Sequence, residues 1–515
     1  GVRMTGTLYI PEGNGPFPAV LNVHGHFLEG KIGDRVQNRG HALAQRGFVV
    51  LSVDALGAGE RSPNEREWNY HGARAGAGLF LTGDSLLAYQ VRDNRRAVDF
   101  LVSLPYVDRE RIGVTGASGG GNQTMWVAAM DERIKVVIPV VSVGSFESYV
   151  GNSNCVCETL PGGLPLCEEW GVLGLIAPRP LLILNALHDS SPAFRPEAVK
   201  YTAQVLEKIY ALHGKREQFD HRIIDQTHGY WPEMLEVATG WLQYWLQGKG
   251  PATAVKLPSH PAVENEVQLC YPKGTRPHEL VSYVENRRTL LKETPRPSVS
   301  GTPDELRASL AALVGWDTRK VAEAAGQRLD LAGEGIRTAV LTSPRAIPLP
   351  VVYRRGSSPE LHLLLSPKGK QSPFVSEQWN RLPSEATVLA VDLPAVGELA
   401  WEYDVIRCDD FHNSARACLW LGYTLAGEWA EAIAALLQAA TPEGTSITIH
   451  AEKEMTLAAL IALALTPSLK ATVREYDAPA NFEEVYEQMN GSLAWIIPGI
   501  LQWGNLEQIR QLAQR

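Results

Sequence analysis

The sequence contains no apolar run long enough to cross a lipid bilayer. Its two most apolar stretches, residues 136–143 and 457–465, fall well short of the roughly 20 residues that a membrane-spanning helix needs. We expect the first to be a buried strand and the second a buried helix. The start, Gly1 to Met4, does not resemble a signal peptide, although a processed N-terminus would look the same. The sequence therefore leaves the compartment open.

Basic charge is also scarce. The chain has 48 Lys and Arg against 57 Asp and Glu, which gives a formal net charge of −9, and it has no basic run. Without a basic surface there is no electrostatic means of attracting nucleic acid or an anionic membrane. We therefore expect neither as a partner. The oligomeric state stays open.

Cysteine is rare, with six in 515 residues, which is too few for a disulfide scaffold. The only cluster is Cys155, Cys157 and Cys167. It lacks a fourth ligand at a suitable spacing, so we predict no metal site there. Two alternatives remain for these residues: a local disulfide to Cys167, or free buried thiols, which we favour.

The chain is too long for one hydrophobic core, and two or three domains are expected. Over residues 1–250, short apolar strands alternate with helical patterns, which predicts a mostly parallel sheet covered on both faces. The expected strands are residues 18–23, 47–53, 111–115, 135–141, 180–185 and 222–225, and the expected helices include 86–104, 123–130 and 232–247. We predict an α/β-hydrolase catalytic domain here.

Residues 251–337 are rich in proline and charge and are interpreted as a linker with a short helical element at 303–314. Thr302 is the expected N-cap of that helix, with Glu305 three residues later as in a capping box.

Residues 338–515 repeat the first half in degraded form. The segment 52–60 (SVDALGAGE) resembles 390–398 (AVDLPAVGE), and 94–101 resembles 429–436, in the same order and at offsets of 335 to 338 residues. At this offset Lys453 takes the place of Ser118, and Arg515 comes before the strands that would carry an acid and a histidine. We predict a degenerate, truncated, non-catalytic hydrolase-like second domain.

The nucleophile that we predict is Ser118, in Gly116-Ala-Ser-Gly-Gly120. This Gly-x-Ser-x-Gly pattern follows an expected strand and opens an expected helix, which is the setting of a nucleophile elbow. The glycines leave room for the tight turn. The alternative is a phosphate-binding glycine turn, but no lysine follows at Walker spacing and no acidic residue ends the next strand.

A serine needs a histidine to take its proton and a carboxylate to orient that histidine. His228 follows a late apolar strand, and Asp189 follows the strand before it, so the chain order is Ser, Asp, His as in α/β-hydrolases. Asp225 is the rival acid, but it lies only three residues before His228. The less well placed histidines are His188, His213 and His221.

The oxyanion of an ester transition state needs two N–H donors. We assign them to the backbone of Gly119, after the nucleophile, and of His26, in the loop His24-Gly25-His26 after an early strand. His24 and His26 are also a conceivable metal pair, but a third ligand is missing nearby. We therefore expect no metal and no cofactor.

Together these residues resemble the acetyl xylan esterase and related carbohydrate esterase branch of the α/β-hydrolases. The resemblance covers about residues 4–248 and implies a metal-free serine esterase that removes acetyl, methyl or feruloyl groups from plant polysaccharides such as xylan. Sequences related to this branch also include serine peptidases, so a peptidase of the same fold is an alternative. A carbohydrate-binding pseudo-hydrolase is the non-enzymatic alternative. The expected partner is a small ester or an acylated carbohydrate, and such a substrate would favour a secreted or periplasmic protein. The motifs are His24-Gly-His26, Asp54 with Gly59-Glu-Arg61, residues 107–121, His188-Asp189 and Thr227-His228-Gly229.

Aromatic residues near the expected pocket have two interpretations. Trp68, Tyr70 and Trp231 could stack on sugar rings, or they could pack under loops. Glu60 and Arg61 are expected to brace the loop after their strand rather than to contact substrate.

Overall fold

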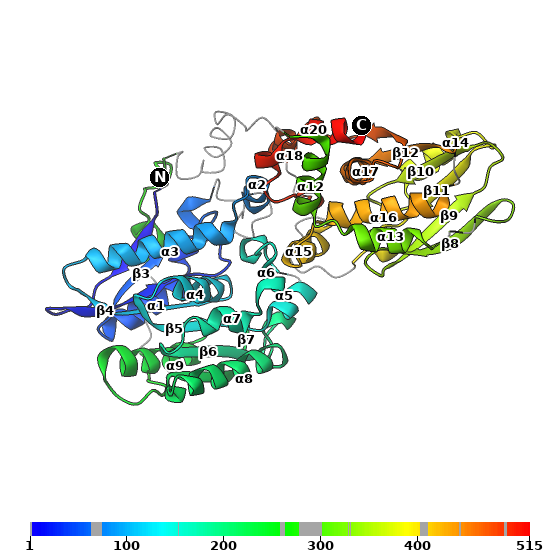
Figure 1. Cartoon of the computed structure of the whole chain (residues 1–515). Helices are drawn as coiled ribbons and strands as arrows, with labels where there is room; N and C mark the ends of the chain where they lie inside the picture. Colours follow the sequence, from blue (N-terminus) through cyan, green and yellow to red (C-terminus); the bar gives the residue numbers. More distant parts are fainter. Residues whose placement is uncertain are drawn as a thin grey trace. The chain divides into compact units, whose positions relative to one another are not determined.

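The chain forms two compact units in the computed structural model (Figure 1). The first comprises Gly1–Gly76 and Ser85–Glu293, and the second comprises Ala77–Asp84 and Thr294–Arg515. The chain thus enters the second unit briefly at α2 (Ala75–Leu81) before it returns to the first. The structure describes residues 3–62, 75–152, 154–257, 263–277, 301–327, 329, 331–401, 410–441, 444–488 and 492–514.

The first unit is built on a seven-stranded sheet with the order β1-β3-β2-β4-β5-β6-β7. β1 is antiparallel to β3, and all the other pairs are parallel. This confirms the predicted α/β fold with a mostly parallel sheet. The strands are β1 (Gly6–Tyr9), β2 (Phe17–Asn22), β3 (Val49–Val53), β4 (Val107–Ala117), β5 (Ile134–Val140), β6 (Leu181–His188) and β7 (Phe219–Thr227).

The central strands are continuous apolar runs because helices cover both faces of a parallel sheet. On one face, Leu43 of α1 and Trp241 of α9 pack in one core cluster with Val20 and Val136 of the sheet. The predicted helix 232–247 continues as a π-helical turn after Leu242. The helices are α1 (Asp34–Gln45), α3 (Leu86–Ser103), α4 (Gly119–Met130), α5 (Phe146–Gly151), α6 (Gly163–Leu166), α7 (Glu169–Gly174), α8 (Pro196–Leu212) and α9 (Pro232–Leu242).

The second unit has a six-stranded sheet with the order β13-β12-β10-β11-β9-β8. β10 to β13 pair in parallel, whereas β9 is antiparallel to β11 and β8 is antiparallel to β9. The run β9-β11-β10-β12-β13 therefore repeats the order and strand directions of β1-β3-β2-β4-β5. The strands are β8 (Ile336–Thr342), β9 (Pro348–Arg354), β10 (Glu360–Leu365), β11 (Thr387–Val391), β12 (Ser446–Glu452) and β13 (Ala471–Tyr476).

Two almost fully apolar helices, α16 and α17, form the centre of the second unit, where they pack against each other. The predicted capping box of α12 is present: the Thr302 hydroxyl accepts from the Glu305 N–H, and the Glu305 carboxylate accepts from the Thr302 N–H. The helices are α12 (Pro303–Val314), α13 (Thr318–Ala325), α14 (Pro373–Arg381), α15 (His412–Trp420), α16 (Leu425–Ala440), α17 (Glu454–Leu465), α18 (Phe482–Gln488), α19 (Ile500–Trp503) and α20 (Leu506–Gln514).

The segment Ala77–Asp84 is held in the second unit by hydrogen bonds to its backbone carbonyls. The Gly499 N–H donates to the Phe80 carbonyl at 2.8 Å, and the Gln502 side chain donates to the Thr82 carbonyl at 2.7 Å. Phe80 itself is 1% exposed. Among the described residues, we find no helix that combines the length and the apolarity needed to span a membrane.

Candidate active site

Ser118 occupies the sharp turn between β4 and α4, with φ 58° and ψ −126°. A residue with a side chain rarely adopts this conformation, so the surrounding structure must hold it in place. The Ser118 N–H donates to the Val140 carbonyl of β5 at 2.9 Å. A Cβ atom on Gly116 would lie 2.6 Å from the Val23 carbonyl oxygen, and one on Gly120 would lie 2.8 Å from the backbone of His24. Both glycines are therefore required by the close approach of β2 and its loop.

His228 and Asp189 are brought together at the ends of β7 and β6. The His228 Nδ1 atom lies 2.9 Å from each oxygen of the Asp189 carboxylate, which is fully buried. The Ser191 N–H donates to the same carboxylate at 2.8 Å, and the His228 ring is stacked on Phe194. An ionised Asp189 holds the proton of His228 on Nδ1 and leaves Nε2 free to accept one. The pair is thus arranged to present a basic nitrogen.

The other candidate acid and histidines make their contacts away from Asp189 and His228. His188 pairs with Asp225 at 3.0 Å, and both side chains are largely exposed. His221 contacts the Asn185 side chain at 3.2 Å. His213 follows α8 as its C-cap. Asp189 makes its histidine contact with His228.

The loop after β2 touches the elbow at its backbone. A Cβ atom on Gly25 would lie 2.6 Å from the Ala117 carbonyl oxygen and 3.3 Å from the Ser118 Cβ. The His26 ring lies against Gly119, because a Cβ atom there would be 2.7 Å from the His26 Cε1. The backbone of Gly25 and the ring of His26 therefore lie against the elbow, and assignment of the oxyanion donors to Gly119 and His26 stays a prediction.

His24 holds this loop in place. Its ring is completely buried; Nδ1 lies 2.7 Å from the Gly25 carbonyl, and Nε2 accepts from the Ala55 N–H at 3.1 Å. One nitrogen must therefore carry the proton and the other must be bare, which is the neutral form. Burial lowers the pKa of His24 in agreement with this. With both nitrogens engaged, His24 is a structural residue rather than half of a metal pair.

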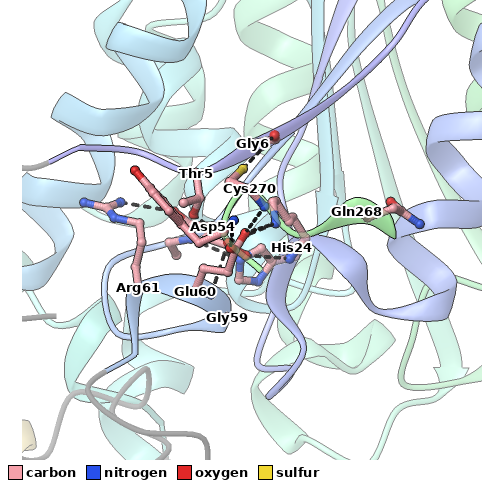
Figure 2. Close-up of polar contacts among 12 residues, drawn as sticks. Thr5, Gly6, His24, Asp54, Gly59, Glu60, Arg61, Gln268 and Cys270 are labelled. Atoms are coloured by element: carbon pink, nitrogen blue, oxygen red, sulfur yellow. Dashed lines mark hydrogen bonds and ion pairs between the residues drawn. The ribbon is translucent and has the colours of Figure 1, made fainter. Parts of the chain in front are cut away.

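A buried ionic network lies next to His24 (Figure 2). The Asp54 carboxylate accepts from the Lys31 N–H at 2.8 Å and from the Thr5 hydroxyl at 2.7 Å, and the Lys31 ammonium reaches Glu60 at 2.6 Å. Although burial alone would lower it, the charges of Asp54 and Glu60 raise the pKa of Lys31. Arg61 donates to the Asp54 carbonyl at 3.1 Å. Glu60 and Arg61 act here as braces of the loop.

Glu60 also anchors a distant segment. Its carboxylate accepts from the N–H groups of Cys270 and Tyr271 at 3.0 and 2.9 Å. Despite its burial, the Lys31 hydrogen bond and these N–H groups lower the pKa of Glu60. Figure 2 shows Cys270 beside the Asp54 network. Residues that the sequence analysis placed in the linker therefore complete the support of the candidate site.

The cysteines are arranged differently from the cluster seen in the sequence. All five described cysteines are free, as the favoured interpretation expected, and Cys155 and Cys157 are buried; Cys167, however, is exposed rather than buried. The His26 Nε2 atom lies 3.3 Å from the Cys157 Sγ, and the ligand atoms of His26, Cys155 and Cys157 all lie within 4.8 Å of one another. Sequence spacing did not reveal this group, because 131 residues separate His26 from Cys157.

Of the three aromatic residues that are predicted to contact sugar, the structure describes one. Trp68 and Tyr70 lie outside the residues that the structure describes. Trp231 is partly exposed; its indole N–H donates to the Thr227 carbonyl at 2.8 Å, and the Arg35 guanidinium lies 4.2 Å from its ring centre. These contacts hold Trp231 beside the His228 loop. A contact between Trp231 and substrate stays a prediction.

Comparisons with known proteins found similar sequences and a similar solved structure. Residues 1–147 match the family model of the acetyl xylan esterases (AXE1). The putative hydrolase YtaP of Bacillus subtilis is 28% identical over 249 residues, which are 45% of this chain and 80% of that protein. The esterase FrsA of Escherichia coli O157:H7 is 30% identical over 138 residues, so this chain spans only 28% of its length. The solved structure of the methylesterase BT1017 has a TM-score of 0.44 at 20% identity and covers 57% of this chain and 65% of its own.

The family whose model matches and the two relatives named above are esterases or hydrolases, so the comparisons support an ester hydrolase. Within that class its N-terminal residues are similar to the acetyl xylan esterases. Both the predicted enzyme class and the predicted family resemblance are confirmed.

Proposed function

We propose that the first unit is a serine esterase that hydrolyses short acyl esters, with acetyl groups on a plant polysaccharide such as xylan as the substrate. One observation carries the proposal. The contact between Asp189 and His228 lies at the carboxyl ends of β6 and β7, on the same edge of the parallel sheet as the strained turn of Ser118. The family match of residues 1–147 supports an ester as the substrate.

In the proposed mechanism, Ser118 attacks the carbonyl carbon of the ester while His228 Nε2 takes the hydroxyl proton. Asp189 stays ionised and stabilises the imidazolium that forms. The N–H groups of Gly119 and His26 stabilise the oxyanion. His228 then protonates the sugar oxygen as its bond to the acyl carbon breaks, so the sugar departs with a free hydroxyl and Ser118 is left acylated. Water attacks the acyl-enzyme with His228 as general base, and acetate departs.

We further propose that the second unit is a degenerate copy of the first that lacks catalytic residues. The shared strand order supports this proposal, and so do matching hydrogen bonds at one corresponding aspartate in each unit. In the first unit Asp54 accepts from the N–H groups of Lys31 and Glu60. In the second unit Asp392 accepts from the N–H groups of Lys370 and Glu398. Lys453 holds the position of the nucleophile.

Two experiments test the esterase assignment. A fluorophosphonate probe should label the wild-type protein at Ser118, and Ser118→Ala should abolish both labelling and hydrolysis of p-nitrophenyl acetate. Lys453→Ala, at the corresponding turn of the second unit, is the matched control and should leave turnover nearly unchanged. Activity that survives Ser118→Ala would refute the proposed nucleophile.

The substrate is tested separately. Acetylated xylan should release acetate, and methyl-esterified pectin, feruloylated xylan and an aminoacyl amide serve as parallel substrates. Release of methanol, ferulate or amine in preference to acetate would keep the nucleophile but overturn the proposed substrate.

A further inference from the structure

His26, Cys155 and Cys157 form a compact group of three soft donor atoms at the side of the elbow. Cys155 and Cys157 are 3% and 0% exposed, and Cys167 and Cys270 are the exposed cysteines of the described chain. The ligand atoms of the group all lie within 4.8 Å of one another. The proposed ester hydrolysis uses none of these three side chains.

The spacing between His26 and Cys157 is close to what a tetrahedral metal ion requires. With metal–sulfur and metal–nitrogen bonds of about 2.3 and 2.0 Å, a nitrogen and a sulfur ligand lie about 3.5 Å apart and two sulfurs about 3.8 Å apart. The His26 Nε2 to Cys157 Sγ distance is 3.3 Å. Only small side-chain movements within the 4.8 Å group are needed to bring Cys155 into place.

The backbone that carries the two cysteines is held in place. Cys155 is the N-cap of a 3-10 turn, Val156–Glu158, which contains Cys157. The Asn154 side chain accepts from the Cys155 N–H at 2.9 Å, and the Thr159 hydroxyl donates to the Cys155 carbonyl at 3.1 Å. A turn anchored in this way presents both sulfurs without the cost of ordering a loop.

We propose that His26, Cys155 and Cys157 bind a thiophilic divalent cation of the Zn²⁺ type, which clamps the loop after β2 to the 155–158 turn. On binding, each thiol releases one proton to solvent and the neutral imidazole donates its Nε2 lone pair. The two thiolates balance the charge of the cation. Three protein ligands leave one tetrahedral position for water.

The consequence for the fold is a cross-link between segments that are far apart in the chain. His26 belongs to the loop that packs against Ser118 and Gly119, while the cysteines belong to the segment after α5. An ion that binds only the folded arrangement stabilises it by mass action. The clamp would therefore make the loop that carries the second proposed oxyanion donor more rigid.

Co²⁺ binding tests the site directly, because tetrahedral Co²⁺ with thiolate ligands gives a charge-transfer band and intense d–d bands. The full-length protein, reduced with a phosphine, is titrated with Co²⁺ and then with Zn²⁺. We expect one Co²⁺ per chain with a thiolate band that Zn²⁺ displaces. A Zn²⁺ concentration of about 100 times its Kd should raise the melting temperature of the first unit by about 5 °C.

Variants then locate the ligands. The pair Cys155→Ser and Cys157→Ser should abolish the thiolate band and the thermal shift, and His26→Gln should lower the affinity for Co²⁺ at least tenfold. The matched control carries Cys167→Ser and Cys270→Ser and should bind as the wild type does. Circular dichroism checks that each variant is folded, and Cys155→Ser alone is the fallback if the double variant is not.

Absence of a thiolate band in the wild type would overturn the proposal. So would a band that survives the Cys155 and Cys157 substitutions or is lost in the control. These readouts do not depend on ester hydrolysis, so they separate a failure of the metal site from a failure of the proposed esterase function.

Discussion

Ser118 and Lys453 have almost the same backbone conformation, with φ 58° and ψ −126° at Ser118 and φ 52° and ψ −124° at Lys453. Each residue follows a parallel strand, β4 or β12, and begins a helix, α4 or α17. In the first unit this unfavourable turn presents the proposed nucleophile. In the second unit the same turn carries an exposed lysine to which we assign no chemistry.

Lys453→Gly is expected to stabilise the second unit. Relief of backbone strain should raise the free energy of unfolding by roughly 1–3 kcal/mol. The greater conformational freedom of glycine in the unfolded chain should lower it by roughly 0.5–1 kcal/mol. The net gain should be about 1 kcal/mol in urea unfolding, with no change in esterase turnover. Ser118→Gly should bring a similar gain in the first unit together with complete loss of turnover. A loss of stability in Lys453→Gly would show that the lysine side chain makes contacts that matter.

Gly25→Ala is expected to damage catalysis rather than substrate binding. The new Cβ would lie 2.6 Å from the Ala117 carbonyl oxygen and would push the His26 loop away from the elbow. Loss of one oxyanion donor lowers kcat by about 100- to 1000-fold, and KM should change little. Gly151→Ala is the control, because a Cβ there meets no atom within 4 Å. Wild-type kcat in Gly25→Ala would refute the assignment of the second oxyanion donor to this loop.

We expect Lys31→Met to lower the free energy of unfolding by more than Lys370→Met does, although the two lysines occupy corresponding networks. Lys31→Met leaves Asp54 and Glu60 as buried carboxylates that are 0% and 7% exposed, and removal of one partner from a buried ion pair costs about 3–5 kcal/mol. Beside Lys370, Asp392 is 2% exposed but Glu398 is 58% exposed. Water can solvate Glu398, so Lys370→Met should cost only about 2 kcal/mol.

Denaturant unfolding of the two variants measures this difference. Equal losses of the free energy of unfolding would mean that the exposure of Glu398 does not matter, and the comparison would then contradict the electrostatic argument.

His450→Gln is expected to make the protein less sensitive to acid. Burial, the His362 ring and Arg474 lower the pKa of His450 to about 4, and its ring nitrogens contact His362 at 3.1 Å and the Tyr476 hydroxyl at 3.2 Å. Between pH 6.5 and 4 the unfolded chain therefore binds a proton at His450 that the folded chain does not. The free energy of unfolding must fall as the pH falls through this window.

The variant should remove roughly 2 kcal/mol of the stability difference between pH 7 and pH 5. Urea unfolding of wild type and variant at both pH values gives the four free energies needed. The same pH dependence in both proteins would exclude His450 as the titrating group.

Much of the first unit could be predicted because its signals are local. Apolar runs mark the parallel strands, and the Gly-x-Ser-x-Gly pattern between a strand and a helix marks the turn at Ser118. The order of Asp189 and His228 along the chain indicated their pairing, which the structure contains at 2.9 Å. Whether these residues act as the catalytic triad remains a prediction.

What could not be predicted depends on contacts between residues distant in sequence. The spacing of Cys155, Cys157 and Cys167 pointed to a local cluster, but the third member of the group is His26, 131 residues before Cys157. The anchoring of Cys270 and Tyr271 on Glu60 lies in a proline-rich stretch without periodicity. Only the folded chain brings such groups together.

The short excursion of Ala77–Asp84 into the second unit limits how the chain can be divided. Because the carbonyls of Phe80 and Thr82 accept hydrogen bonds from Gly499 and Gln502, a single cut after Glu293 would remove these partners from the N-terminal fragment. The two halves are interleaved rather than joined end to end. A truncation after Glu293 would therefore leave a segment in the middle of the N-terminal fragment without its packing partners, so no single cut yields two intact units.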